Sequence, residues 1–265
     1  MFTFNSNLKS STKKKKSWLC VGLDINPEAI GSDKLSDLKE YTFKVIDATR
    51  RSAIAYKPNF AFFERWGSNG FSWLEETVSY IGNSHIKIAD AKRGDIGSTA
   101  NQYAESIFNH FGFDAVTLNP YMGKDSIQPF IQNPEKGAFI LCRTSNPSAS
   151  DFQNDRTEQT PLFEKVAHWA NDLNTYDNIG LVVGATAPQE LSKVRKISPD
   201  LSLLVPGVGV QGGNMETSLK ISNQTGVGLI NVSRSINFAG NMSSGDITNT
   251  AELYVQNMRH LFHYE

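Results

Sequence analysis

Eight short apolar runs recur along the chain, and each predicts a β-strand. Their residues are continuously apolar rather than alternating with polar ones, which is typical of parallel strands buried on both faces. The runs are SWLCVGLD (17–24), AIAYKPNF (53–60), HIKIADA (85–91), AVTLNP (115–120), AFILCRTS (138–145), IGLVVGAT (179–186), LSLLVPGVG (201–209) and GLINVSRS (228–235).

Between these runs the apolar positions follow helical spacing. Ser98 is placed to cap one helix, and Pro161 and Pro188 each predict a helix start with proline at its first position. A last helix is expected over about 247–262, with Leu253, Met258, Leu261 and Phe262 facing inward. Strand and helix alternate roughly every 30 residues, which favours a (β/α)8 TIM barrel of the α/β class. A doubly wound sheet is the alternative, and no linker or low-complexity break divides residues 1–265 into more than one domain.

Composition narrows the classes of partner. The net charge of the 265 residues is -1, which implies no attraction to nucleic acid or membranes, and no stretch has the roughly 18 apolar residues of a membrane span. Cys20 and Cys142 lie in apolar runs and make no disulfide framework, so we expect a reducing, cytoplasmic location. The Lys13–Lys16 run is best explained as the solvated end of a first helix, the alternative being weak attraction to anionic surfaces.

Polar residues gather where the predicted strands end. In a barrel the chemistry lies at the C-terminal ends of the strands, so these side chains would share one rim. The rim residues are Asp24, Lys57, Asn59, Asp90, Lys92, Asp95, Asn119, Thr144, Ser145, Gln211 and Arg234.

The stretch DAKRGD (90–95) carries the most distinctive charges. Asp90 and Lys92 are two residues apart on a strand, so we expect both side chains to point the same way and Lys57 to join them from the next strand. Alternating carboxylates and ammonium groups favour the ionised form of each, which would make Lys92 a charged, positioned proton donor. The alternative is a structural ion-pair network that closes the barrel mouth.

The motif PGVGVQGG (206–213) contains G-x-G-x-x-G but is a weak dinucleotide fingerprint, because it lies after the seventh strand and no acidic residue follows at the required place. A phosphate loop fits better, with Gln211 as a neutral donor and Arg234 as a bidentate one. The glycines could instead serve tight turns alone. We therefore expect a phosphorylated small molecule and no metal or organic cofactor, with either proton transfer to a carbanion or Schiff-base chemistry at Lys57 or Lys92.

Several of these motifs together resemble the orotidine 5'-phosphate decarboxylase family. They are D-x-K-x-x-D at Asp90, Lys92 and Asp95, the stretches LCVGLD and PGVGVQGG, and Arg234 after the last strand. KPNFAFFE, RTSNPSA and VVGATAP resemble the subgroup with many bacterial and apicomplexan members. The resemblance extends from about residue 19 to 235.

The resemblance implies a carboxy-lyase that converts orotidine 5'-monophosphate to UMP and CO2 in de novo pyrimidine synthesis, without metal or cofactor. By the motif match, Lys92 would protonate C6, Asp90 would lie against the substrate carboxylate, and Lys57 would hold Asp90 and the ribose. Asp95 would be the fourth catalytic residue and would help to fix Lys92. The remaining implied contacts with substrate come from Asp24 and Asn59, from Ser145 and Pro206 at the pyrimidine, from Gln211 and Arg234 at the phosphate, and from Ile96 and Thr99.

The resemblance also implies a homodimer with shared active sites, in which Asp95 and Thr99 serve the neighbouring subunit. It leaves open a partnership with an orotate phosphoribosyltransferase. Two other functions stay open from the sequence: a sugar-phosphate decarboxylase or aldolase of the same barrel, and a non-catalytic barrel that binds a phosphorylated ligand.

Overall fold

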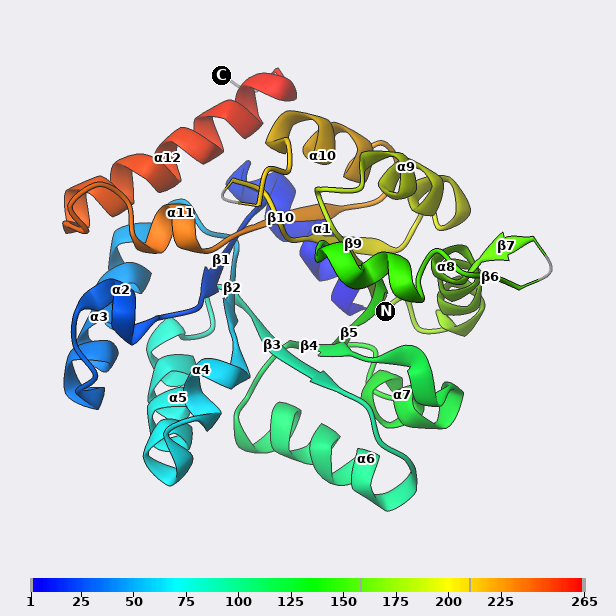
Figure 1. The fold of residues 1–265 in the computed structure, drawn as a ribbon, viewed down its shortest axis with the longest axis horizontal. Helices are drawn as coiled ribbons and strands as arrows, with labels where there is room; N and C mark the ends of the chain where they lie inside the picture. The colour runs from blue at the N-terminus through cyan, green and yellow to red at the C-terminus, as the bar shows by residue number, and fades with distance from the viewer. Residues whose placement is uncertain (1, 158, 210, 264–265) are drawn as a thin grey trace.

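The computed structural model describes residues 2–157, 159–209 and 211–263, and within them eight parallel strands close into a barrel (Figure 1). The ring runs in the order β1-β10-β9-β8-β5-β4-β3-β2, which confirms the (β/α)8 barrel over the doubly wound sheet. Each of the eight predicted runs overlaps one strand, and six of the strands lie wholly within their runs. The strands are β1 (Leu19–Leu23), β2 (Ala55–Pro58), β3 (Ile86–Arg93), β4 (Ala115–Leu118), β5 (Gly137–Arg143), β8 (Ile179–Val183), β9 (Ser202–Val205) and β10 (Gly228–Val232).

Helices surround the ring of strands, as Figure 1 shows. They are α1 (Phe4–Lys15), α2 (Pro27–Ile30), α3 (Leu35–Thr49), α4 (Phe60–Glu64), α5 (Gly67–Ile81), α6 (Gly97–Glu105), α7 (Lys124–Ile131), α8 (Leu162–Leu173), α9 (Pro188–Ile197), α10 (Met215–Ser222), α11 (Arg234–Asn237) and α12 (Ser244–Leu261). The short elements are η1 (Ser106–His110), η2 (Pro120–Met122), η3 (Pro147–Asp151) and an antiparallel pair of β6 (Arg156–Thr157) and β7 (Thr160–Pro161). The sequence pattern did not predict this small pair.

The strands are buried on both sides because the barrel has apolar groups inside and helices outside. Every residue of β1, β2 and β4 is buried, as the continuous apolar runs predicted. Inside the barrel, Phe139 and Leu204 belong to one apolar cluster, and between barrel and helices Trp73 and Leu191 belong to another. Fully burying such a side chain contributes about 1.5–3 kcal/mol.

Helix α1 covers the end of the barrel where the strands begin. The Asn5 amide donates to the carbonyl of Ile179 at the start of β8 (3.0 Å), and the Phe4 ring packs edge-on against Phe139 at 5.8 Å. Gly137, the first residue of β5, makes room for that ring, since a Cβ there would lie 2.5 Å from it. The last turn of α1 carries the lysine run, and Lys13 and Lys14 are exposed, as predicted for a solvated helix end, whereas the Lys15 ammonium donates to the carbonyl of Arg50 at 3.0 Å.

Two predicted helix starts are displaced, one by two residues and the other by one. Helix α6 begins at Gly97, so Ser98 lies inside it and does not cap it. Pro161 pairs in β7 and precedes α8, which begins at Leu162. Only Pro188 occupies the first helical position, as predicted, at the start of α9. The serine and proline signals in the sequence therefore located these two helix starts to within one or two residues, but not the terminal residue itself.

The predicted inward face of the last helix was wrong at one of its four residues, since Leu261 and Phe262 are partly buried against the core. Met258 is buried as predicted, but Leu253 is 57% exposed, so its inward placement was wrong. The buried stripe passes instead through Ile247, Ala251 and Val255 at helical spacing. Leu253 lies two residues from Ala251 and two from Val255, and therefore on the opposite face of the helix.

Both cysteines are buried, and neither forms a disulfide. Burial raises the pKa of Cys20 to about 12, so its thiol stays protonated at neutral pH. No helix among the described residues is both long and apolar enough to cross a bilayer.

Candidate active site

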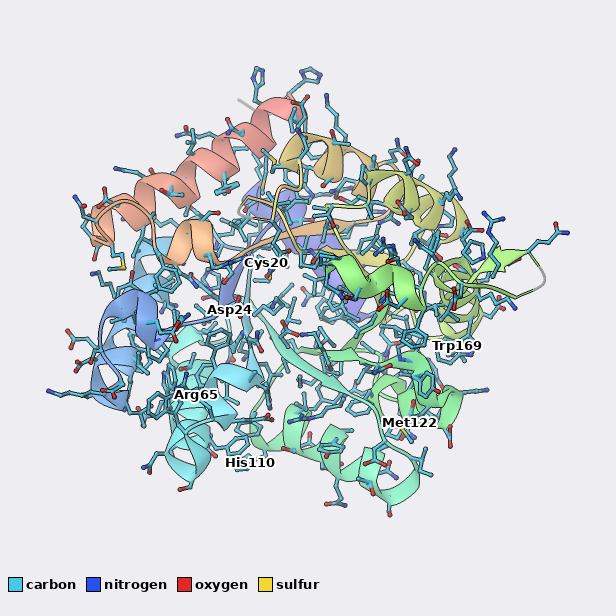
Figure 2. All side chains as sticks on the ribbon, in the orientation of Figure 1. Cys20, Asp24, Arg65, His110, Met122 and Trp169 are labelled. Carbon is cyan, nitrogen blue, oxygen red and sulfur yellow. The ribbon has the colours of Figure 1, made fainter. Side chains whose placement is uncertain are left out.

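A cavity of about 180 Å³ opens at the C-terminal ends of the barrel strands. Figure 2 shows Asp24 toward the middle of the ring of strands, whereas Arg65 and His110 lie on outer elements. The cavity therefore lies at the predicted rim. Its lining includes the predicted residues Asp24, Lys57, Asp90, Ser145, Pro206, Gln211 and Arg234, together with Gly207, Val208, Asn231, Ser233 and Ser235.

Asp90 bridges two lysines, as the sequence predicted. The Lys57 ammonium forms an ion pair with Oδ2 of Asp90, and the Lys92 Nζ lies 2.5 Å from Oδ1. The side chains of Lys57 and Asp90 are 6% and 10% exposed, while that of Lys92 is 51% exposed. Lys92 is thus held at one end by a buried carboxylate but remains open toward an incoming molecule.

These groups are charged despite their burial. Burial opposes ionisation of Asp90, but the ammonium groups of Lys57 and Lys92 outweigh it and hold the pKa of Asp90 well below its usual range. Burial likewise opposes the charge on Lys57, but Asp90 and Asp24 outweigh it and raise the pKa of Lys57. At neutral pH, Asp90 is therefore a carboxylate and Lys57 an ammonium ion.

An irregular segment of β3 presents Asp90 and Lys92. Ala89 pairs with Val116 and Arg93 pairs with Leu118, so three residues of β3 face the single residue Thr117 of β4. Lys92 adopts a left-handed backbone conformation, with φ of 46°. The two side chains do meet, but regular strand alternation, on which the prediction rested, is not the reason.

Asp24, which the sequence predicted to bind the substrate, has an unsatisfied acceptor. Its Oδ1 is buried and has no hydrogen-bond partner within the described residues, and the same holds for Oδ1 of Asn231 on β10. Both residues line the cavity. Leaving a buried acceptor unpaired costs free energy, so both positions favour a ligand that brings hydroxyl donors.

The glycine-rich loop after β9 forms the opposite end of the cavity. Gly209 has φ of 85°, and a Cβ there would lie 2.5 Å from Oγ of Ser235, so glycine is required. The Ser145 hydroxyl donates to Oε1 of Gln211 at 3.0 Å and joins this loop to the loop after β5. Arg234 begins α11 directly after β10 and is exposed at the cavity. Val210, within the same motif, lies outside the described residues.

Five predicted residues are not among those that line the cavity of their own chain; one of them, Lys92, reaches its edge through the ion pair with Asp90. Asn59 caps α4 by accepting from the amide of Ala61 at 3.3 Å. Asp95 accepts from the amide of Ile96, and Ile96 and Thr99 are exposed. The 95–99 segment is therefore open to a neighbouring molecule.

Two other predicted rim residues form hydrogen bonds within their own loops. The Asn119 side chain accepts from the amide of Tyr121 at 3.0 Å and caps η2. Thr144 donates to Asn146 at 2.6 Å and binds Gln153 within the same loop. Both residues stabilise loops around the cavity, and neither of them lines it.

Sequence reasoning missed Thr117, Asn231, Ser233 and Ser235. Thr117 contacts Asp90 from β4, and the other three line the cavity. Asn231 carried a usable signal, because it is a polar residue inside the apolar run of β10. Thr117 carried none, since threonine is ordinary in a strand.

The arrangement suits an elongated anionic ligand. One end offers a lysine ammonium fixed by a buried carboxylate, and the other offers an arginine beside a loop rich in backbone N–H groups. The unsatisfied acceptors of Asp24 and Asn231 lie in the same lining. Within the described ranges, no three His, Cys, Asp or Glu side chains are grouped to bind a metal ion.

The comparisons with known proteins agree on one family. The family described as "Orotidine 5'-phosphate decarboxylase / HUMPS family" matches residues 17–244. An orotidine 5'-phosphate decarboxylase of Halorubrum lacusprofundi is 44% identical over 253 residues, covering 91% of this chain and 90% of the relative. The structure of Leishmania donovani OMP decarboxylase is 37% identical, with a TM-score of 0.88 and full coverage of both chains. The Leishmania donovani UMP synthase is 39% identical with a TM-score of 0.90, and this chain spans 57% of its length.

Proposed function

This chain belongs to the orotidine 5'-phosphate decarboxylase / HUMPS family and converts orotidine 5'-monophosphate to UMP and CO2; we propose that Lys92 is the group that protonates C6. The observation that carries the proposal is the carboxylate of Asp90 held between two ammonium groups at the cavity. Lys57 is buried, whereas half of the Lys92 side chain is exposed. Lys92 is therefore the lysine that can reach a substrate atom.

The substrate fits the cavity in one direction. Its phosphate would bind Arg234 and Gln211, and its ribose hydroxyls would donate to the unsatisfied acceptors of Asp24 and Asn231. Ser145 and Pro206 would meet the pyrimidine. This placement turns C6 toward Asp90 and Lys92.

The reaction needs a cation where negative charge develops. As CO2 leaves, the electron pair of the broken bond stays on C6, and an ammonium group already in place stabilises it without reorganisation. The Lys92 proton then moves to C6, and the neutral amine regains a proton from solvent. Asp90 holds Lys92 in place, and its low pKa keeps the carboxylate ionised throughout.

The experiment is the loss of orotidine 5'-monophosphate absorbance with purified protein treated with EDTA. We expect full turnover, and UMP as the product by chromatography. Turnover that required added Mg²⁺ would favour sugar-phosphate chemistry of the same barrel. Binding of UMP without any turnover would favour a non-catalytic barrel.

We propose that two copies of the chain share their active sites. The Asp95, Ile96 and Thr99 segment does not line its own cavity, and Ile96 is 49% exposed. Nearby loops at the same end of the barrel also expose Tyr121 and Phe152. A second copy would bury this apolar surface and bring Asp95 to the neighbouring cavity.

Three further expectations accompany the decarboxylase activity. We propose that the whole of residues 1–265 acts as one domain, because one barrel and its helices include most of the chain. We also propose a cytoplasmic location, which the two free cysteines support. Association with an orotate phosphoribosyltransferase, whose product would be the substrate, can be tested by co-purification of that activity.

A further inference from the structure

The hydroxyl of Thr117 binds the irregular segment of β3 at several points. Oγ1 accepts from the amide of Ala91 at 3.1 Å and from the amide of Lys92 at 3.0 Å. Its own proton faces two acceptors, Oδ1 of Asp90 at 3.3 Å and the carbonyl of Ala89 at 3.4 Å. Thr117 is buried, so water does not replace these contacts.

The register explains why a hydroxyl is needed there. Extra residues in one strand leave backbone N–H groups without carbonyl partners on the neighbouring strand. Ala91 and Lys92 are such residues, and Thr117 is the one residue of β4 that faces them. A single side-chain oxygen thus replaces the missing carbonyl acceptors.

The same contact fixes the direction of Lys92. Its φ of 46° lies in the left-handed region, which a residue with a Cβ rarely adopts. The hydrogen bond from its amide holds this conformation, and the ion pair with Asp90 holds the ammonium. Two residues of the charged cluster therefore depend on one oxygen of the adjacent strand.

We propose that Thr117 is a positioning residue that sets the geometry of Lys92 and Asp90 for protonation of C6. This inference rests on the proposed role of Lys92. Thr117 does not line the cavity and touches no substrate in this arrangement, so it acts through its neighbours. A valine of nearly the same shape would fill the space but accept neither amide.

The test compares Thr117→Val with Thr117→Ser. Because a displacement of about 1 Å can cost about 10²-fold in rate, we expect Thr117→Val to lower kcat by about that factor. The KM and the Kd for UMP should change little, since phosphate and ribose are bound elsewhere. Thr117→Ser keeps the oxygen and should recover most of the rate.

Thr77→Val is the matched control. Thr77 is also buried, and its hydroxyl donates to the carbonyl of Trp73 at 2.8 Å on α5, away from the cavity. This variant loses a buried hydroxyl too, but it should keep wild-type kcat. Wild-type kcat in Thr117→Val, or a serine variant as slow as the valine one, would overturn the inference.

A second readout separates this inference from the decarboxylase activity. In Thr117→Val the backbone amide of Lys92 loses its hydrogen-bond acceptor. This loss should loosen the Lys92–Asp90 ion pair and expose the Lys92 amine. In Thr117→Val, acetic anhydride should therefore acylate Lys92 faster, relative to the exposed Lys13, as peptide mapping by mass spectrometry would show. Faster acylation in a protein without decarboxylase activity would refute the function but keep the geometry. Unchanged acylation would refute the positioning role, whatever the activity.

Discussion

The two ends of the cavity are held in different ways. At the reacting end, Lys57 and Asp90 are buried, and every group is fixed by a charged or hydrogen-bonded neighbour on a strand. At the phosphate end, Arg234 is exposed on a four-residue helix, and the adjoining loop contains glycines with positive φ. We call the first the rigid end because buried ion pairs and hydrogen bonds fix its groups, whereas the second is exposed and rich in glycine.

This difference follows from what each end must do. A charge that develops on C6 is stabilised only by groups that need no rearrangement during the reaction. The phosphate keeps its charge throughout, so its binding needs no such fixed arrangement, and the energy of binding it can serve the distant reacting carbon. The predictions below test this division, from the largest expected effect to the smallest.

Replacing the proton donor should affect the rigid end alone. In Lys92→Ala we expect decarboxylation to fall to background, because Lys57, the other lysine of the cluster, is buried against Asp90, while the Kd for UMP stays near that of the wild type. Stopped assays for CO2 and calorimetry with UMP measure the two quantities. Exposed Lys13→Ala is the control. Turnover near the wild-type rate would remove Lys92 from its proposed role.

Mixing two inactive variants should show which chain completes the rigid end. If Asp95 serves the neighbouring subunit, a mixed dimer of Lys92→Ala and Asp95→Ala has one site with both lesions and one with neither. Random exchange should then restore up to about a quarter of wild-type activity. If Asp95 serves its own chain, every site keeps one lesion. Subunit exchange verified by mass, without recovered activity, would refute the shared site.

Asp90→Asn should show how much stability the protein loses when one partner of the buried ion pair at the rigid end is removed. Lys57 would be left as a buried charge without its pair, which lowers the free energy of unfolding by about 3–5 kcal/mol. Urea titration at pH 7 measures this loss, and Asp246→Asn on the exposed start of α12 is a comparison. An unchanged midpoint would mean that the pair stabilises nothing.

The same carboxylate predicts the pH dependence. The pKa of Asp90 is lower in the folded than in the unfolded protein, so its contribution is present above the unfolded value of about 3.9. It is lost as the pH falls from there through the folded pKa. Wild-type protein should therefore lose more stability than Asp90→Asn over this acid range, and parallel curves would contradict the assignment.

Replacing the phosphate contact should produce the smallest effect and mainly on binding. In Arg234→Ala we expect the KM for the substrate to rise by about 10–10²-fold, as expected for one charge-assisted hydrogen bond of about 1.5–3 kcal/mol. Turnover of the nucleoside without phosphate should hardly change, because it never makes the contact. An equal penalty for both substrates would place Arg234 in the rigid end.

The sequence predicted much of this site because strand ends are visible in it. Lys57 and Asp90 follow apolar runs, and parallel strands in a barrel bring such residues together whatever the details of packing. Thr117 could not be predicted, because its role depends on a register shift between two strands. Leu253 was misplaced because an apolar residue on an exposed helix face resembles a buried one until its neighbours are known.

Helix α1 has a consequence for the order of events during turnover. Phe4 packs on Gly137 and Phe139 where the strands begin. Among the described residues, the cavity at the opposite end of the barrel is therefore the route by which substrate enters and products leave. Substrate, UMP and CO2 must then pass through the same opening of the cavity, so UMP must leave before a new substrate can enter.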